Sequence, residues 1–206
     1  FQDPFAALSP RRRAFDQIAE PMVIHNWGSP QKIRERVRWL LNRVGLGDEH
    51  LDRFPHEFSG GQRQRLCIAR ALALEPELLI ADEPVSALDV SVQAQVLELF
   101  SELQLELGLT YLFISHDLAI VEQVSEAVAV MFMGRLVEYG PSKKVLSDPG
   151  HEYTKNLLAS IPVPDPTKTL SKPKLFAEGR KSPIIPYGTM TGPVQMKEIG
   201  AGHYIY

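Results

Sequence analysis

Two adjacent carboxylates, Asp82 and Glu83, follow a short unbroken apolar run, Leu78–Ala81. Such a run is typical of a buried parallel strand, and open α/β sheets bind ligands at the carboxyl ends of such strands. Burying both carboxylates without partners would be costly, so we expect a cation or a bound water molecule beside them. Asp82 suits a Mg²⁺ ion, and Glu83 suits the polarisation of an attacking water molecule.

The stretch Ser59-Gly60-Gly61-Gln62 has the pattern of a helix start. Ser59 is expected to cap the first turn, and Gln62 to reach back and complete a capping box. The two glycines leave backbone N–H groups uncovered by side chains, so an oxyanion can approach closely. Good helix formers follow over Gln62–Leu74, and the positive end of that helix dipole would face the anion. We therefore predict an anion site, most naturally for phosphate.

Asp89 and His116 complete the set of residues that could do chemistry. Asp89 is predicted to cap a helix over Val90–Leu107, where apolar residues recur on one face. His116 follows a strand predicted over Thr110–Ile114, which places it on the same sheet edge as the paired carboxylates. A structural role is the alternative for each of them.

Taken together and in this order, these segments resemble four motifs of ATP-binding cassette (ABC) ATPases. They are the signature motif at Ser59–Gln62, the Walker B strand with its catalytic glutamate at Leu78–Glu83, the D-loop at Val85–Asp89, and the switch-histidine motif at Ile114–Asp117. Each alone has an ordinary alternative, such as a plain helix cap or a solvated turn. Their combination at this spacing favours the functional interpretation.

The first residues, Phe1–Arg11, are rich in proline, so we expect an extended, turn-rich segment with no helix running through it. This segment is similar to the Q-loop of peptide-transporting ABC ATPases, with Gln2 at the glutamine position. The resemblance implies that Gln2 contacts the metal or the attacking water, and that the loop contacts a membrane subunit. The stretch His50–Glu57 before the signature is most similar to the oligopeptide/dipeptide branch.

The resemblance implies ATP hydrolysis with Mg²⁺, in which positioning and electrostatic stabilisation of the γ-phosphoryl group do most of the catalysis. The implied site residues are Glu83 and His116 for catalysis, Ser59, Gly60, Gly61, Gln62 and Asp89 for nucleotide binding, and Gln2 and Asp82 for the metal. It also implies that the signature binds the γ-phosphate of ATP held by a second ATPase subunit, in a homodimer or heterodimer.

The expected fold is α/β, a partial ABC-type nucleotide-binding domain with a mostly parallel sheet. Residues 1–161 would form that domain, including a helical subdomain at about 11–74, and residues 162–206 a small C-terminal extension. Within the extension, Val194–Ile199 alternates as a strand does, and His203 is expected to be an ordinary surface histidine. The extension has no cysteine, which excludes a cysteine-ligated iron–sulfur cluster there.

Composition limits the partners. The chain has 206 residues and a net charge of −3, which argues against nucleic acid as the main partner. Its one cysteine, Cys67, cannot form an internal disulfide and is expected in the core. No apolar run is long enough to span a membrane, so membrane association is expected through permease subunits, peripherally at the cytoplasmic face of the inner membrane.

No G-x-x-x-x-G-K-S/T phosphate loop occurs in the sequence, which begins at Phe1. We therefore expect the later part of a larger domain, and an isolated chain that hydrolyses no ATP above background. Two hypotheses remain: an ATPase subunit that energises peptide import, or a truncated, non-catalytic fragment that only lends its signature motif to a partner. The sequence does not identify the transported solute.

Overall fold

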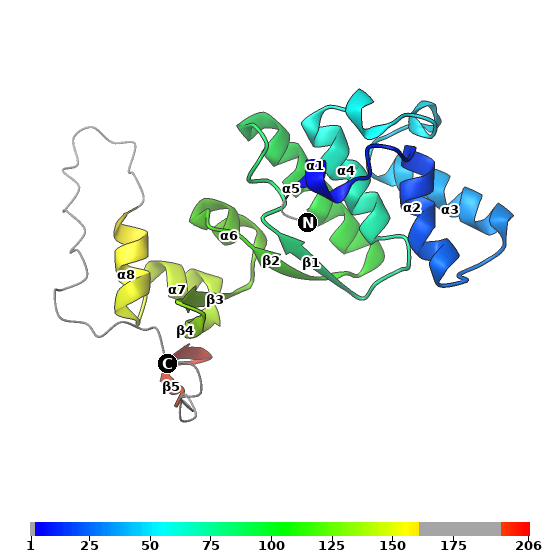
Figure 1. The fold of residues 1–206 in the computed structure, drawn as a ribbon. Helices are drawn as coiled ribbons and strands as arrows, with labels where there is room; N and C mark the ends of the chain where they lie inside the picture. The colour runs from blue at the N-terminus through cyan, green and yellow to red at the C-terminus, as the bar shows by residue number, and fades with distance from the viewer. Residues whose placement is uncertain (1–2, 161–194) are drawn as a thin grey trace, which may run out of the picture. The chain divides into compact units, whose positions relative to one another are not determined.

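The computed structural model describes residues 3–160 and 195–206, and the chain divides into two compact units, Phe1–His116 and Asp117–Tyr206 (Figure 1). All the candidate site residues belong to the first unit. The described elements are mixed α and β, which confirms the expected fold class.

The first unit is mainly helical. Its helices are α1 (Pro4–Ala7), α2 (Ala14–Ile24), α3 (Pro30–Arg43), α4 (Gly60–Ala71) and α5 (Val90–Leu107), with 3₁₀ turns η1 (Asp48–His50) and η2 (Pro55–Glu57) before α4. The other four helices all pack on α4. Leu66 and Ile68 of α4 are buried, as are Ile18 of α2 and Leu40 of α3, the two helices that pack on it. Apolar burial on several sides therefore fixes α4, the helix that carries the Ser-Gly-Gly-Gln stretch.

Two expectations for this unit are corrected. The segment Phe1–Arg11 was predicted to be free of helix, but it contains the four-residue α1, which starts at Pro4. Proline is well tolerated at the first helical position because no N–H is needed there. The helix predicted to reach Leu74 ends instead at Ala71, and the chain then turns through Glu75, whose φ is 54°.

Strands β1 (Leu78–Asp82) and β2 (Thr110–Ile114) form a parallel pair in which Asp82 is the register partner of Ile114. The pair is covered on one face only, where Leu79 and Ala81 are buried. On the other face, the exposed apolar side chains are Leu78, Ile80, Leu112 and Ile114. The continuous apolar run thus forms the predicted strand. It was expected to be buried throughout, but only every second residue of it is buried.

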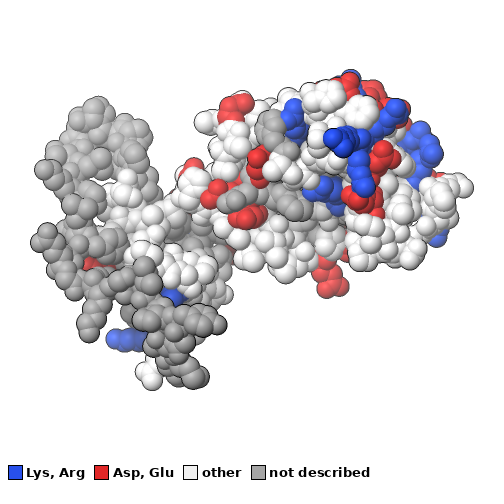
Figure 2. All heavy atoms as spheres, in the orientation of Figure 1, with Lys and Arg blue, Asp and Glu red and all other residues white. Residues whose placement is uncertain are grey.

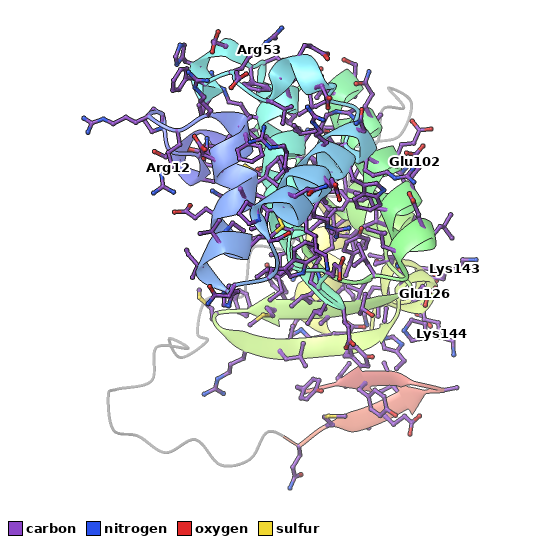
Figure 3. The ribbon with its side chains drawn as sticks, turned by 90° about the vertical axis from the view of Figure 1, so that its right-hand side faces the viewer. Arg12, Arg53, Glu102, Glu126, Lys143 and Lys144 are labelled. Carbon is purple, nitrogen blue, oxygen red and sulfur yellow. The ribbon has the colours of Figure 1, made fainter. Side chains whose placement is uncertain are left out.

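The second unit contains a four-stranded sheet in the order β3-β4-β6-β5. Its strands are β3 (Ala127–Phe132), β4 (Arg135–Pro141), β5 (Lys197–Gly200) and β6 (His203–Ile205), and its helices are α6 (Leu118–Val124), α7 (Ser142–Ser147) and α8 (Glu152–Ala159). Val128, Val130, Val137 and Val145 form its core. Figure 3 shows the β5–β6 hairpin in red beside the other two strands.

Parallel pairing in the described residues is confined to β1 and β2, whereas the expected sheet was mostly parallel. All neighbours in the second sheet are antiparallel. For two of the three pairs the reason is the short connection between the strands: Met133-Gly134 joins β3 to β4, and Ala201-Gly202 joins β5 to β6. Connections this short can only reverse the chain direction. The further division into residues 1–161 and 162–206 stays a prediction.

His203 was expected at the surface, but it is buried and lies on the central strand β6. Its Nε2 atom lies 2.6 Å from Oε1 of Glu138 on β4. The same carboxylate accepts hydrogen bonds from the backbone N–H groups of Gly150 at 2.7 Å and His151 at 3.1 Å. A buried carboxylate that lacked such donors would be costly, so its partners hold the C-terminal strand and the start of α8 to β4.

The structure bears on two predictions made from composition, the burial of Cys67 and the lack of a membrane-spanning segment. Cys67 is a buried core residue of α4, as expected, and burial raises the pKa of its thiol to about 11. Within residues 3–160 and 195–206, no helix is both long enough and apolar enough to cross a membrane.

Candidate functional site

Asp82 and Glu83 lie where β1 ends, at the carboxyl edge of the parallel pair. The Glu83 N–H donates to the Ile114 carbonyl at 2.9 Å, which continues the pairing one residue beyond the strand. Glu83 has a φ of 45°, a left-handed conformation that is uncommon for a residue other than glycine. The Ser86 hydroxyl donates to the Glu83 carbonyl at 3.0 Å and so helps to hold this turn. Conformations of this kind cost roughly 1–3 kcal/mol and cluster at functional sites.

The turn brings the Glu83 carboxylate to His116. Oε1 of Glu83 lies 3.0 Å from Nδ1 of His116, two residues beyond the end of β2. The Glu83 side chain is 28% exposed, and that of His116 is 74% exposed. An acceptor carboxylate and an imidazole therefore lie together at a solvent-accessible edge, an arrangement suited to general-base chemistry on a water molecule. The sequence prediction that these residues share an edge is confirmed in geometry.

Asp82 fits the role of a magnesium ligand. It is half-buried at the same edge and precedes Glu83 directly. Mg²⁺ takes one or two protein carboxylates and completes its shell with phosphate oxygens and water. No group of three or more His, Cys, Asp or Glu side chains that could hold a metal ion occurs in the described part of the chain. The other predicted metal residue, Gln2, lies outside the described residues.

The start of α4 has the capping box that the sequence predicts. The Gln62 N–H donates to Oγ of Ser59 at 3.3 Å, and the Ser59 N–H donates to Oε1 of Gln62 at 3.0 Å. These reciprocal bonds satisfy one N–H group at each end of the box. Gly60 and Gly61 occupy the positions between them, in the first turn, where N–H groups have no partner within the helix.

The two glycines lie against the start of α5. A Cβ atom on Gly61 would come within 2.5 Å of Cγ1 of Val92, whereas one on Gly60 would meet Cδ2 of Leu88 at 3.7 Å. The first distance leaves no room for a side chain, and the second is an ordinary van der Waals contact. Glycine at position 61 therefore allows close approach of α4 to α5, a role that the sequence analysis did not identify.

Asp89 caps α5, as predicted. Its carboxylate accepts from the Ser91 hydroxyl at 2.7 Å and from the Val92 N–H at 3.1 Å. These hydrogen bonds, the one from Ser91 first, hold the pKa of the Asp89 carboxyl below its ordinary value. The carboxylate is thus an anionic acceptor at the exposed loop between β1 and α5.

Gln93 holds that loop in shape and was missed by the sequence analysis. Its side-chain amide donates to the carbonyls of Val85 at 3.1 Å and Leu88 at 3.0 Å. The only sequence signal for it is a polar residue four positions after Asp89, on the first turn of a predicted helix. Across the site, the contacts join the candidate residues in two groups. Glu83 contacts His116, and the Gly60-Gly61 turn contacts the start of α5.

The surface of the first unit carries charges of both signs, with Lys and Arg interspersed among Asp and Glu (Figure 2). Ion pairs at the surface include Arg13 with Asp52 at 2.7 Å and Arg43 with Glu106 at 2.6 Å. Arg12, which pairs with Glu20, lies at the outer surface in Figure 3. Exposed pairs of this kind stabilise a fold by only about 0–1 kcal/mol each, so this face is an ordinary solvated one.

Comparison with known families places these residues in context. The family model "ABC transporter" matches residues 1–86, and the model "Oligopeptide/dipeptide transporter, C-terminal region" matches residues 137–180. The chain is also 51% identical over 205 residues to the glutathione import ATP-binding protein GsiA of Salmonella typhimurium. The chain is thus similar to the ABC transporter family over residues 1–86. Within it, the second model indicates the oligopeptide/dipeptide branch.

The curated relatives are longer than the chain. It is 49% identical over 205 residues to GsiA of Escherichia coli strain K12, again a glutathione import ATP-binding protein. In both comparisons the match includes 100% of this chain and 33% of the relative. The chain thus spans about a third of the length of these curated relatives.

Solved structures give the same result for the fold. CbiO1 of Clostridium perfringens, described as part of the ABC transporter complex cbiONQ, matches with a TM-score of 0.64 and 34% identity over 76% of this chain and 61% of that one. The ATP-binding cassette MJ0796 was solved as a dimer in a post-hydrolysis state bound to ADP and Pi. It matches with a TM-score of 0.59 and 28% identity, and the match covers 69% of this chain and 61% of that one.

Proposed function

We propose that this protein acts in an ATP-binding and ATP-hydrolysing subunit that energises the import of peptides. The observation that carries the proposal is the contact between Glu83 and His116 beside Asp82, at the carboxyl edge of a parallel strand pair. The family match over residues 137–180 and the import function named for the GsiA relatives support a peptide or peptide-like solute.

In this proposal the residues at the edge of β1 and β2 act on the γ-phosphate of ATP. Asp82 and Gln2 would hold a Mg²⁺ ion, which would supply positive charge to stabilise the phosphoryl oxygens. Glu83 accepts a proton from, or orients, the attacking water molecule. His116 donates to a γ-phosphate oxygen and, through its contact with Glu83, helps to orient the carboxylate.

The Ser59–Gln62 turn serves a second nucleotide in this proposal. The N–H groups of the first turn of α4 and the positive end of its dipole face the γ-phosphate of ATP held by another ATPase subunit. Asp89 lies at the neighbouring start of α5, which suits it to the same interface. A dimer with ATP between its subunits, associated with permease subunits at the cytoplasmic face of the inner membrane, completes the proposal.

The test uses the protein produced from the whole coding sequence and measures the steady-state release of phosphate from ATP. We expect Mg²⁺-dependent turnover that Glu83→Gln abolishes, while binding of a fluorescent ATP analogue remains. The matched control is Glu77→Gln, which changes an exposed carboxylate just before β1. The absence of turnover in the parental protein would instead favour the alternative, a non-catalytic chain that only lends its signature to a partner.

A further inference from the structure

The loop between β1 and α5, residues 83–89, contains two overlapping turns. In the first, the Glu83 carbonyl accepts from the Ser86 N–H at 3.3 Å and from the Ser86 hydroxyl at 3.0 Å. In the second, the Val85 carbonyl accepts from the Leu88 N–H at 3.1 Å. The two turns share Val85 and Ser86, so a change of shape in the second turn also changes the first.

The second turn is held from α5 by the side chain of Gln93. Its amide nitrogen donates to the carbonyls of Val85 at 3.1 Å and Leu88 at 3.0 Å. Both acceptors are carbonyls, which only the NH₂ end of the amide can satisfy, so its two N–H donors are both used within the loop. The Gln93 side chain is half-buried, and it reaches back from the helix to the turn that precedes it.

Glu83 needs such support because its backbone is strained. Its φ of 45° is a conformation that persists only where the surrounding structure holds it. Strand pairing holds its N–H at the Ile114 carbonyl, and Ser86 holds its own carbonyl from inside the loop. Two hydrogen bonds of ordinary strength are comparable in free energy with the strain of one such residue. Loss of the two bonds from Gln93 is therefore enough to let the loop relax.

We propose that Gln93 is a positioning residue for the Glu83 carboxylate. By fixing the second turn, it keeps Ser86 bonded to the Glu83 carbonyl and so keeps the carboxylate at its 3.0 Å contact with His116. Gln93 acts through the main chain of the loop, to which both of its hydrogen bonds are made. The inference rests on the proposed function for the role of Glu83 in hydrolysis, but the hydrogen bonds themselves do not.

The same helix offers a matched control two positions further on. Gln93→Glu keeps the shape of the side chain but replaces both N–H donors with an acceptor oxygen, which the two loop carbonyls repel. Gln95 is exposed, and residues two apart on a helix do not face the same side. Gln95→Glu therefore makes the same change of charge on α5 without removing a hydrogen bond from the loop.

The first experiment measures hydrogen exchange at single amides in the protein produced from the whole coding sequence. Gln93→Glu should raise exchange about tenfold at the amides of Ser86 and Leu88, because both N–H groups close the turns. Gln95→Glu should leave both amides at the parental rate. If Gln93→Glu does not fold, Gln93→Leu, which removes the donors without adding charge, replaces it under the same expectation.

A reference amide separates local from general loosening. The Thr110 N–H donates to the Glu77 carbonyl at 3.0 Å, at the opposite end of the strand pair from Glu83. Its exchange should stay parental in the folded Gln93 variant. Unchanged exchange at Ser86 and Leu88 overturns the proposal, and so does an equal rise at Thr110, because that result means a general loss of stability.

The second experiment measures phosphate release and ATP binding in the same protein. Gln93→Glu should lower kcat about tenfold while the Kd for ATP stays near parental, because Glu83 is proposed to act on the attacking water and not to hold the nucleotide. Gln93→Lys, which keeps N–H donors on a long side chain, should recover most of the rate, and Gln95→Glu should keep the parental kcat.

Parental kcat in Gln93→Glu rejects the positioning role, and so do equal losses in Gln93→Glu and Gln95→Glu. If the parental protein itself has no turnover, the proposed function fails. The exchange experiment then still decides whether Gln93 holds the loop that carries Glu83.

Discussion

The Glu83 carboxylate lies 3.0 Å from the His116 ring, although the two residues are 33 positions apart in the sequence. Strand pairing creates this proximity, because the Glu83 N–H is bonded to Ile114 and His116 follows Ile114 by two residues. The Glu83 backbone is left-handed at this point, with a φ of 45°, and its carboxylate reaches the His116 ring.

From this contact we expect that replacing either Glu83 or His116 lowers ATP turnover in the protein produced from the whole coding sequence. Glu83→Gln keeps the side chain's shape but removes its charge and basicity, so turnover should fall by at least about a hundredfold while ATP binding persists. His116→Ala should also lower turnover. In the double variant the losses should not add, because the proposed mechanism assigns both residues to one water molecule and one phosphate. Phosphate release and ATP binding measure this, and parental turnover in either single variant contradicts its role.

A second prediction concerns the two glycines at the start of α4. Gly61→Ala should destabilise the first unit by about 1–3 kcal/mol, because its new methyl group would overlap the β-branched Val92. Gly60→Ala should be nearly neutral, since its methyl group has room beside Leu88 and alanine is the better helix former. Urea unfolding followed by tryptophan fluorescence measures both, because Trp27 and Trp39 lie in this unit. Val92→Ala in the Gly61→Ala background should recover part of the loss; if it recovers none, the clash is not the cause.

The capping box supports a third prediction. Ser59→Ala removes the acceptor for the Gln62 N–H and should cost about 1 kcal/mol of stability, whereas Ser59→Asp should retain the cap. The two variants separate folding from anion binding, because a carboxylate keeps the helix capped but repels phosphate. We expect Ser59→Asp to unfold at a parental urea concentration while the protein from the whole coding sequence loses ATP-driven dimerisation, measured by size-exclusion chromatography. Parental dimerisation in Ser59→Asp would contradict the placement of phosphate at this turn.

Local signals predicted much of this structure from the sequence. α5 begins and ends at the predicted residues, because Asp89 caps its start and Gly108, with a φ of 64°, ends it. β2 likewise has its predicted bounds, and the capping box at Ser59 forms as expected. In each case the residues that determine where the element begins or ends lie close to that end in the sequence. Their spacing is therefore sufficient to predict its bounds.

The polar side-chain contacts outside the helix caps were not predicted, for a corresponding physical reason. The partners of Gln93 and His203 are main-chain carbonyls or a distant carboxylate, and no periodicity marks such an acceptor. The sequence placed Glu83 and His116 together because both follow parallel strands, but it gave no sign of the left-handed turn. The functional roles of the site residues, Gln2 among them, stay predictions until the variants are measured.

The last prediction concerns Glu138, which holds β6 and the start of α8 to β4. Burial raises the pKa of its carboxyl group, but this is outweighed by the neighbouring Thr154 hydroxyl and by hydrogen bonds from Gly150, His203 and His151, so the pKa lies below the ordinary 4.5. The Thr154 hydroxyl has no hydrogen bond of ordinary geometry among the described residues, so the other three donors are the firm partners.

A folded-state pKa below the unfolded one means that the unfolded chain binds the proton more readily as the pH falls. The stability that Glu138 contributes is therefore complete above about pH 4.5 and is lost as the pH falls through the lower folded pKa. Hydrogen exchange at the Tyr206 N–H, which donates to Val137 at 3.0 Å, reports whether the C-terminal strand remains bound. Protection should fall steeply below pH 4.5 in the parental chain, and it should already be low at pH 7 in Glu138→Gln, with a weaker pH dependence. Glu198→Gln is the control, because that carboxylate is exposed in the same hairpin, and it should keep the parental profile. If Glu138→Gln also keeps the parental profile, the Glu138 carboxylate does not hold the C-terminal strand in place.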